Sequence, residues 1–318
     1  MTSTMKRTTG TSLAFGYASG LTMAFGAAIS FAAARAGILG GLAPDDMIFV
    51  RFVVAGAIMF PFLLHWGLPT LAGIGWPRGL ALLATGGPLF AILQTGGYAF
   101  APLAHGAVIA PSVVTILSTI GAGVLLGERL TRSHLIGAAM VLAGILLIAG
   151  HGALASPIGA STWIGDLLFF ASSVLWAGFT LLIRYWRVDA VRATAVVAVL
   201  SLCVSAPIYL AYRGPAHLSD LPLGVLAVQG IVQGLVQAVI TIMAYSRAIA
   251  ILGVSRAVLF PAIVPAISII IGIPLLGEIP TTLQIAGLLF VSLGLLVAIG
   301  ILRKTPATEG SVKKLRPA

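Results

Sequence analysis

The sequence predicts an all-α integral membrane protein with ten transmembrane helices, built as two inverted five-helix repeats. Composition is the first observation behind this fold class: 59% of the 318 residues are hydrophobic and 8% are charged, whereas a soluble domain carries about 25% charged residues. The second is that the apolar residues gather in runs of about 20, the length of a membrane-spanning helix. The third is a repeat that relates the two halves of the chain.

Ten apolar segments are expected to cross the membrane as helices. Backbone polar groups find no water in lipid, and these segments lack the alternating pattern of barrel strands, so a helix is the remaining solution. The first segment is longer than the core of about 7–15 residues that is typical of a cleavable signal peptide, and we expect it to be retained. The segments cover residues 13–34, 47–66, 79–100, 105–126, 133–151, 164–184, 192–211, 223–246, 255–276 and 283–302.

Basic residues gather on one side of the predicted membrane. With a cytoplasmic N-terminus and ten crossings, every Lys and Arg except Arg35, Arg51 and Arg213 falls on the cytoplasmic side. Multi-pass proteins carry such an excess of basic residues in their cytoplasmic loops. The net charge of +10 is therefore assigned to topology rather than to nucleic-acid binding. The sequence predicts a protein of the cell inner (cytoplasmic) membrane with both termini in the cytoplasm.

The repeat is clearest at LLGERLT (125–131), which matches LLGEIPT (275–281) 150 positions later. Each half contains five segments, an odd number, so the halves are expected to cross the membrane in opposite directions, as in inverted-repeat secondary transporters. The match continues at Pro111 and Pro261, Gly137 and Gly287, Val141 and Val291, Gly144 and Gly294, and Gly150 and Gly300. The expected domains are a cytoplasmic N-terminal segment (1–12), two five-helix repeats (13–151 and 164–302) and a basic cytoplasmic tail (303–318).

These features resemble the EamA-type branch of the drug/metabolite transporter superfamily. The resemblance is carried by the ten spans, the inverted repeat, the LLGE that closes spans four and nine with Glu128 and Glu278, and an arginine near the start of span two, Arg51 in FVRFVVAG. It implies a multi-pass carrier, often an exporter of amino acids or related small metabolites, with a central cavity built from both halves. Span seven departs from the arginine pattern, because Arg192 lies at its cytoplasmic edge.

Span eight contains QGIVQGLVQ, in which Gln229, Gln233 and Gln237 share one face of an α-helix. An amide that faced lipid would leave its donors and acceptors unpaired, so the stripe is expected to face the bundle interior. One interpretation is hydrogen bonding to a neighbouring helix, helped by the close packing that Gly230 and Gly234 allow. The other is a polar cavity wall, which we favour for the stripe as a whole, with Gln233 as its best single candidate.

Five further residues are candidates for the substrate cavity. An alignment of span three with span eight places Gln94 one turn before Tyr98, as Thr241 lies one turn before Tyr245. Tyr98, Tyr245 and Trp176 are expected either to stack on a substrate or to serve in packing. Arg51 is expected to bind a substrate carboxylate or, alternatively, to pair with Asp45 or Asp46.

Two other groups are assigned to the moving parts and turns. Pro111, Pro261 and Pro265 lie inside spans four and nine, where proline kinks a helix, and they are candidate hinges or gates. Glu128 and Glu278 each precede a helix start, and the second is followed by the capping box TTLQ (281–284). We interpret both carboxylates as charges that organise a turn rather than as proton carriers.

The sequence thus predicts a secondary transporter that moves a small polar metabolite, an amino acid or a related solute, by export and alternating access. The alternative is a non-transporting membrane sensor or channel. We expect no enzyme, because GxSxG, HExxH and P-loop motifs are missing, and no cofactor or metal. The expected partners are a small-molecule substrate and membrane lipid, without nucleic acid; a homodimer is a further candidate. The sequence leaves proton coupling, facilitated diffusion and exchange open.

Overall fold

The computed structural model describes residues 10–127, 131–154, 159–257 and 259–298, and all the regular structure in these ranges is helical. Its elements are α1 (Gly10–Leu39), α2 (Pro44–Trp66), η1 (Leu68–Thr70), α3 (Trp76–Gly86), α4 (Pro88–Phe100), α5 (Leu103–Leu126), α6 (Arg132–Leu154), α7 (Gly159–Trp186), α8 (Ala190–Arg213), α9 (His217–Asp220), α10 (Leu223–Gln229), η2 (Gly230–Thr241), α11 (Ile242–Leu252), α12 (Val254–Ala257), α13 (Leu259–Leu276) and α14 (Thr282–Ala298).

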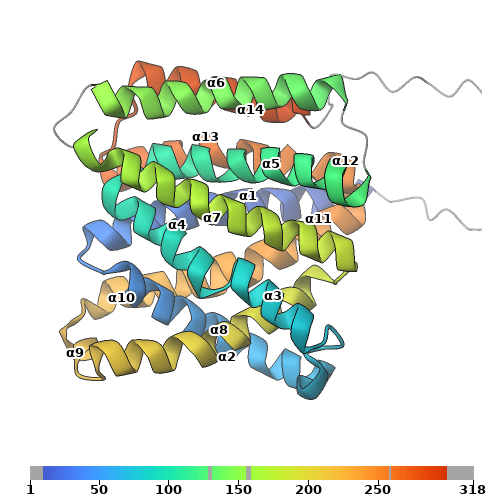
Figure 1. Cartoon of the computed structure of the whole chain (residues 1–318), viewed down its shortest axis with the longest axis vertical. Helices are drawn as coiled ribbons and strands as arrows, with labels where there is room; N and C mark the ends of the chain where they lie inside the picture. Colours follow the sequence, from blue (N-terminus) through green and yellow to red (C-terminus); the bar gives the residue numbers. More distant parts are fainter. Residues whose placement is uncertain (1–9, 128–130, 155–158, 258, 299–318) are drawn as a thin grey trace, which may run out of the picture.

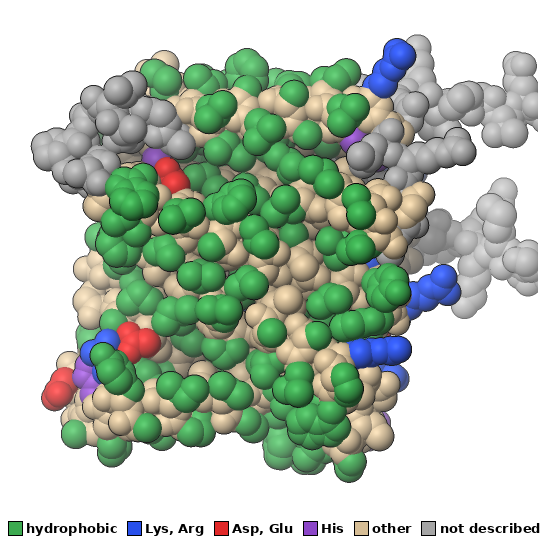
Figure 2. All heavy atoms as spheres, in the orientation of Figure 1, with side chains coloured by type: hydrophobic (Ala, Val, Ile, Leu, Met, Phe, Trp, Pro, Cys, Tyr) green, Lys and Arg blue, Asp and Glu red, His purple; other side chains and the backbone are tan. Residues whose placement is uncertain are grey.

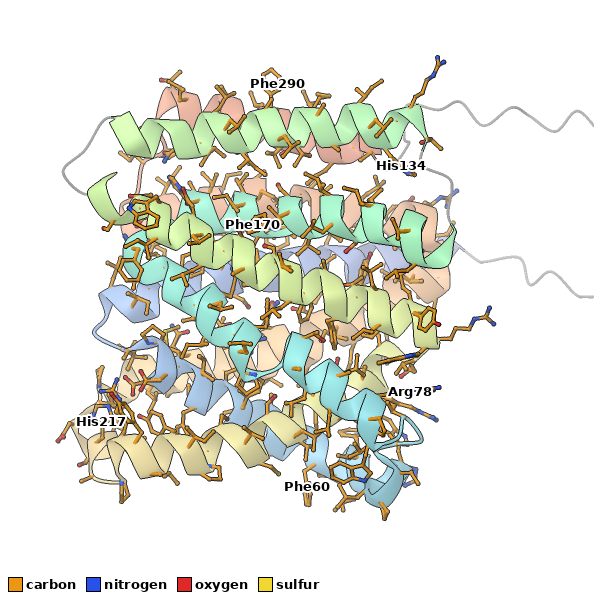
Figure 3. The ribbon with its side chains drawn as sticks, in the orientation of Figure 1. Phe60, Arg78, His134, Phe170, His217 and Phe290 are labelled. Carbon is orange, nitrogen blue, oxygen red and sulfur yellow. The ribbon has the colours of Figure 1, made fainter. Side chains whose placement is uncertain are left out.

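Eight helical stretches in the described residues are long and apolar enough to cross a membrane. They are α1, α2, α3 with α4, α5, α7, α8, α10 through α11, and α13. Two shorter apolar helices accompany them, at Arg132–Ile148 within α6 and at α14. The molecule is therefore a multi-pass membrane protein. Side chains on its outer surface fit this setting: Phe60, Phe170 and Phe290 are exposed and project away from the helices that carry them (Figure 3).

The predicted spans 79–100 and 223–246 lie within candidate membrane spans of the structure, but neither is one continuous α-helix. The first is broken at Gly87, which leaves helical geometry with φ −93° and ψ −144°, and Pro88 cannot donate the hydrogen bond that would continue α3. In the second, Gly230–Thr241 forms a π-helix, η2, between α10 and α11. The pattern of apolar residues predicts that a segment spans the membrane, but it does not indicate where the backbone hydrogen bonding changes within the span.

The long helices assemble into two groups of equivalent composition. In bundle A, α1 packs on α13, α11 and η2; in bundle B, α7 packs on α5 and α4. The 150-residue repeat relates α1 to α7, α4 to η2 and α11, and α5 to α13, so each bundle combines helices from both halves of the chain. The remaining helices pair with their own repeat counterparts, α2 with α8 and α6 with α14. The α6–α14 pair forms a separate layer at the top of Figure 1.

The contact between α6 and α14 is reciprocal. A Cβ atom added at Gly144 would lie 2.6 Å from the carbonyl oxygen of Gly287, and one added at Gly287 would lie 2.7 Å from that of Gly144. Gly137 and Gly294 meet in the same way, at 2.5 and 2.8 Å. The repeat relates Gly137 to Gly287 and Gly144 to Gly294. Gly144 therefore contacts the counterpart of Gly137, and Gly137 contacts the counterpart of Gly144. Such self-complementary contacts are the mark of an approximate two-fold axis.

Charged side chains separate to the two ends of the helices (Figure 2). On the face shown, blue Lys and Arg side chains gather at the end where Arg78 is labelled in Figure 3, and red carboxylates gather at the opposite end, near His217. The arginines at this second end, Arg35 and Arg213, form ion pairs with Glu278 and Asp45. For reference, we call the end that carries His217 the outer end; its side of the membrane is part of the function proposed below.

The glycine contacts predict a position-specific sensitivity. Gly144→Val would force side-chain carbon atoms onto the backbone of α14, and overpacking of this kind costs about 1–3 kcal/mol. We expect a lower thermal unfolding midpoint in detergent, measured by intrinsic fluorescence. Gly224→Val is the matched control, because a Cβ atom at this exposed position of α10 meets nothing within 4 Å. Equal midpoints for the two variants would contradict the close approach of α6 and α14.

Candidate functional site

Two of the three glutamines bind the backbone of α1. Gln229 Nε2 donates to the carbonyl oxygen of Ala33 at 2.6 Å, and Gln233 Nε2 donates to that of Ser30 at 2.7 Å. Both side chains are buried. These bonds are the interhelical contacts that we considered as one of two interpretations, and they fix α10 and η2 against α1. A cavity role for either residue stays a prediction.

The amide stripe still holds polar atoms that are not paired. Within the described residues, Gln237 Oε1, Gln229 Oε1 and Thr241 Oγ1 are buried without a hydrogen-bond partner. Leaving a buried acceptor or donor unsatisfied costs about 1–3 kcal/mol. Gln237 is only half-buried and has no side-chain hydrogen bond to the described residues. Of the three glutamines, it is the one whose whole amide is free to bind water or a solute.

Arg51 is an unpaired cation within a membrane span. It lies about two turns into α2, with its Nε buried and its guanidinium carbon 5.7 Å from the ring centre of Phe52. The described residues give it no ion pair or hydrogen bond. An ionisable side chain inside a membrane is expensive unless it is paired or faces a polar cavity. Arg51 therefore marks a place where an anionic group would be stabilised.

The two carboxylates that we considered as partners of Arg51 are bound elsewhere. Asp45 accepts two hydrogen bonds from Arg213, at 2.7 and 2.9 Å. Asp46 is buried and accepts from Tyr209 at 2.6 Å, and its Oδ1 also lies 3.1 Å from His217 Nε2. These partners come from α8 and α9, which lie beside the first turn of α2, whereas Arg51 lies deeper along the helix. The structure does not bring Arg51 to either aspartate.

Aromatic side chains connect α2, α4 and α7 near the break at Gly87. Phe52 of α2 packs in one cluster with Ala91 of α4, and Phe90 packs against that cluster. The half-buried Trp176 of α7 lies 4.7 Å from Phe90 between ring centroids. The first turn of α4 thus carries an aromatic surface that extends from the Arg51 side of α2 to Trp176.

Gln94 lies one turn further along α4. Its Oε1 accepts a hydrogen bond from Ser172 of α7 at 2.7 Å, while its Nε2 is buried with no hydrogen-bond partner among the described residues. Gln94 thus resembles Gln229: one atom of its amide forms a hydrogen bond between two helices, and the other atom forms no hydrogen bond with the described residues. Its role in substrate binding stays a prediction.

The two tyrosines that the alignment related do not come together. Tyr98 is fully buried near the outer end, where its ring meets Phe169 edge-on at 4.8 Å. Tyr245, on α11, packs against the cluster that includes Met23 and Phe260. In Figure 1, α4 ends on the left of the molecule, whereas α11, to which the alignment relates it, lies on the right.

The candidate hinges lie within continuous helices. Pro111 is inside α5 and Pro265 is inside α13, whereas Pro261 lies in the first turn of α13; their role as gates stays a prediction. The capping box is confirmed, because Thr281 N donates to Gln284 Oε1 and Gln284 N donates to Thr281 Oγ1, at 2.9 and 3.3 Å.

Of the two glutamates of the LLGE motifs, the structure describes only Glu278. Glu128 lies outside the described residues. Glu278, in the turn between α13 and α14, accepts from Arg35 Nε at 2.7 Å and from the Leu103 backbone N–H at 2.8 Å. Sequence reasoning missed Arg35, and it also missed the contact between His105 Nδ1 and Asp166 Oδ1 at 2.8 Å. The position of these residues in the sequence could have indicated the contacts, because Arg35, His105 and Asp166 are all polar residues at the outer end of a predicted span.

Comparison with known proteins identifies the relatives of this chain. The EamA-like transporter family model matches residues 14–150 and 163–300. An uncharacterized transporter of Bacillus subtilis (strain 168), YyaM, is 28% identical over 193 residues, which cover 59% of this chain and 62% of YyaM. The uncharacterized protein PA1977 of Pseudomonas aeruginosa is 34% identical over 180 residues, 55% of this chain and 58% of PA1977. Each match spans about three fifths of the relative's length.

The fold is similar to that of a solved protein crystal structure. The TM-score is 0.59 at 21% sequence identity, with 90% of this chain and 97% of the other covered. At this identity, the likeness extends to the fold alone.

The different surroundings of the glutamines predict different effects of substitution. Gln233→Leu removes the bond to Ser30, and interhelical bonds of this kind are worth about 0.6–2 kcal/mol, so we expect a folded protein with a lower thermal midpoint. Gln237→Leu removes no described bond, and we expect an unchanged midpoint with reduced solute flux. Thermal melting in detergent and flux in proteoliposomes measure the two effects. Unaltered flux in Gln237→Leu would remove this residue from the site.

Proposed function

The chain belongs to the EamA-like transporter family, and from this premise we propose that it is a secondary carrier that exports a small polar metabolite bearing a carboxylate, an amino acid or a related solute, by alternating access. The observation that carries the proposal is that the two EamA repeats assemble into two bundles of equivalent composition. Carriers that work by alternating access rock such repeat-related groups against each other around a central site.

The inverted ten-span architecture is part of this proposal. The eight candidate spans become ten when the shorter apolar helices α6 and α14 are counted. The reciprocal glycine contacts support an axis that relates the two halves. Five spans in each half would then place equivalent helices in opposite directions, and the positions of α4 and α11 in Figure 1 support this reading.

Helix breaks at equivalent positions support a binding site in the middle of the molecule. The alignment of Tyr98 with Tyr245 places Gly87, at the α3–α4 break, onto Gly234, within η2. Interrupted helices in corresponding positions of two halves mark the substrate site in many inverted-repeat transporters. Gly234 faces α2: a Cβ atom there would lie 3.1 Å from the carbonyl oxygen of Arg51. The irregular segment of span eight thus packs against the backbone of α2 at Arg51.

The chemistry of these groups favours a carboxylate-bearing solute. Arg51 would bind the carboxylate, since a guanidinium matches this group with two parallel hydrogen bonds. The unused amide atoms of Gln94 and Gln237 would bind polar substituents, and Phe90 with Trp176 would contact an apolar portion. The excess of basic residues at the Arg78 end supports a cytoplasmic location of that end in the inner membrane, with both termini there. We propose export as the direction of transport on the basis of the family resemblance.

Counterflow in proteoliposomes tests the function directly. Purified protein is reconstituted, the vesicles are preloaded in turn with pooled amino acids, purine and pyrimidine compounds, or small sugars, and the matching labelled solute is added outside. We expect labelled amino acids or other carboxylates to accumulate without an imposed gradient. Failure of every pool, with protein shown to be folded, would favour the alternative of a non-transporting sensor or channel.

Substitution of Arg51 tests the proposed substrate class. Arg51→Gln removes a charged hydrogen bond worth about 1.5–3 kcal/mol, so we expect the apparent affinity for the carboxylate substrate to fall roughly 10-fold to 100-fold. Arg78→Gln is the control, because this arginine stacks on Trp186 at the opposite end. A methyl ester of the substrate should be affected much less by Arg51→Gln than the free acid. Equal losses for acid and ester would contradict carboxylate recognition by Arg51.

A further inference from the structure

The hydrogen bonds between helices within each bundle differ from those that cross between the bundles. Within bundle B, Ser172 binds Gln94 and Ser173 donates to the carbonyl oxygen of Ala110; within bundle A, η2 donates to α1 through Gln233. These bonds hold each bundle together as a unit. The side-chain bonds between bundles A and B in the described residues converge on one ion pair, Arg35 with Glu278.

Arg35 and Glu278 both belong to bundle A. Arg35 is in the last turns of α1, and Glu278 follows α13 directly. Arg35 Nε donates to Glu278 Oε1 at 2.7 Å, and the two side chains are 16% and 24% exposed. Partial burial makes the pair stronger than one on an open surface, where water and salt would weaken the attraction.

The same two side chains reach across to bundle B. Arg35 Nη1 donates to the carbonyl oxygen of Tyr98 in α4, and Glu278 Oε2 accepts from the backbone N–H of Leu103, the first residue of α5. The first N–H groups and last carbonyl groups of a helix have no partner within the helix. A cation is also favoured at a helix C-terminus and an anion at an N-terminus. The ion pair therefore completes both helix ends that flank the α4–α5 connection.

Apolar packing between the bundles lies at the same end of α1. Ala32 and Ala34, one turn from Arg35, share a buried cluster with Tyr98, Leu103 and other residues of bundle B. The first half of α1, by contrast, packs in a cluster formed by residues of bundle A alone, which include Met23 and Phe260. The outer end is thus where the described contacts between α1 and bundle B concentrate.

We propose that the Arg35–Glu278 pair is the latch that keeps the carrier closed at its outer end, and that it must release Tyr98 and Leu103 each time the protein opens there. The inference rests on the proposed alternating access of the two bundles. It assigns a role to the LLGE motif of the second repeat: Gly277 ends α13 with a positive φ of 67°, and the turn presents Glu278 to α5. Arg35 and Glu278 are positioning residues for the bundles and need not touch the substrate.

Cysteine accessibility from the outer side tests the latch without any knowledge of the substrate. The single native cysteine, the exposed Cys203, is replaced by Ser, and Ala32→Cys introduces a thiol at a fully buried position facing bundle B. Intact cells are treated with a charged, membrane-impermeant thiosulfonate reagent. In the parent protein the thiol is expected to react slowly. We expect Glu278→Gln and Arg35→Gln each to raise the labelling rate at least tenfold.

The second ion pair at the same end provides the matched control. Arg213→Gln breaks the bond to Asp45, which joins α2 to α8 and involves neither bundle. This variant should leave the labelling of Ala32→Cys at the parent rate. If Glu278→Gln is not recovered folded, Glu278→Asp keeps the charge but shortens its reach, and we expect an intermediate rate.

The outcomes separate this inference from the proposed function. Faster labelling in the latch variants supports the latch even if counterflow has failed for every solute pool. Labelling at the parent rate in folded Arg35→Gln and in either folded Glu278 variant would overturn it, even in a protein that carries amino acids. An equal increase in the Arg213→Gln control would also overturn it, because the effect would then reflect general loosening of the outer end.

Discussion

The constraint on which this structure depends is that a polar group in lipid must find its partner within the protein. It explains why regular structure in the described residues is helical, since each helix pairs its own backbone groups. Many hydroxyl side chains follow the same rule: Ser19, Thr115 and Thr180 donate to the carbonyl four residues earlier in their own helix. Longer polar side chains cannot fold back in this way, so they bind neighbouring helices and thereby decide which helices stay together.

Three of the exceptions to this constraint belong to the proposed site. Arg51, Gln94 and Gln237 retain buried polar atoms with no hydrogen-bond partner in the described residues, and α2, α4 and η2 carry them. Two of these elements belong to the spans whose helices are interrupted, at Gly87 and within η2. We propose that a solute, rather than the protein, satisfies these three groups.

The same groups of contacts support the proposal that each bundle moves as a rigid unit. Bonds such as that of Gln233 to Ser30 lie inside a bundle and would not need to change in the proposed rocking of the bundles. The glycine contact of α6 with α14 lies outside both bundles and relates the halves of the chain. Between the bundles, the described polar contacts are few and lie at the outer end, where Arg35 and Glu278 meet.

The sequence by itself determined the properties that depend on local pattern. Apolar runs of helical length gave the spans, the match of LLGERLT with LLGEIPT gave the repeat, and the TTLQ motif gave the capping box that Thr281 and Gln284 form. The spans and the capping box depend on residues that are close together in the chain, and the repeat depends on comparison of one segment with another. Tertiary structure alone decided the partners of the polar side chains.

Gln229 binds a carbonyl 196 residues away and Arg35 a carboxylate 243 residues away, and neither is implied by the residues around it. Asp45 and Asp46 were equally plausible partners of Arg51 until α8 and α9 placed Arg213, Tyr209 and His217 beside them. The physical reason is that a polar group in a bilayer takes whichever partner the packing of helices brings within about 3 Å, and that packing is set by contacts distributed over the whole chain.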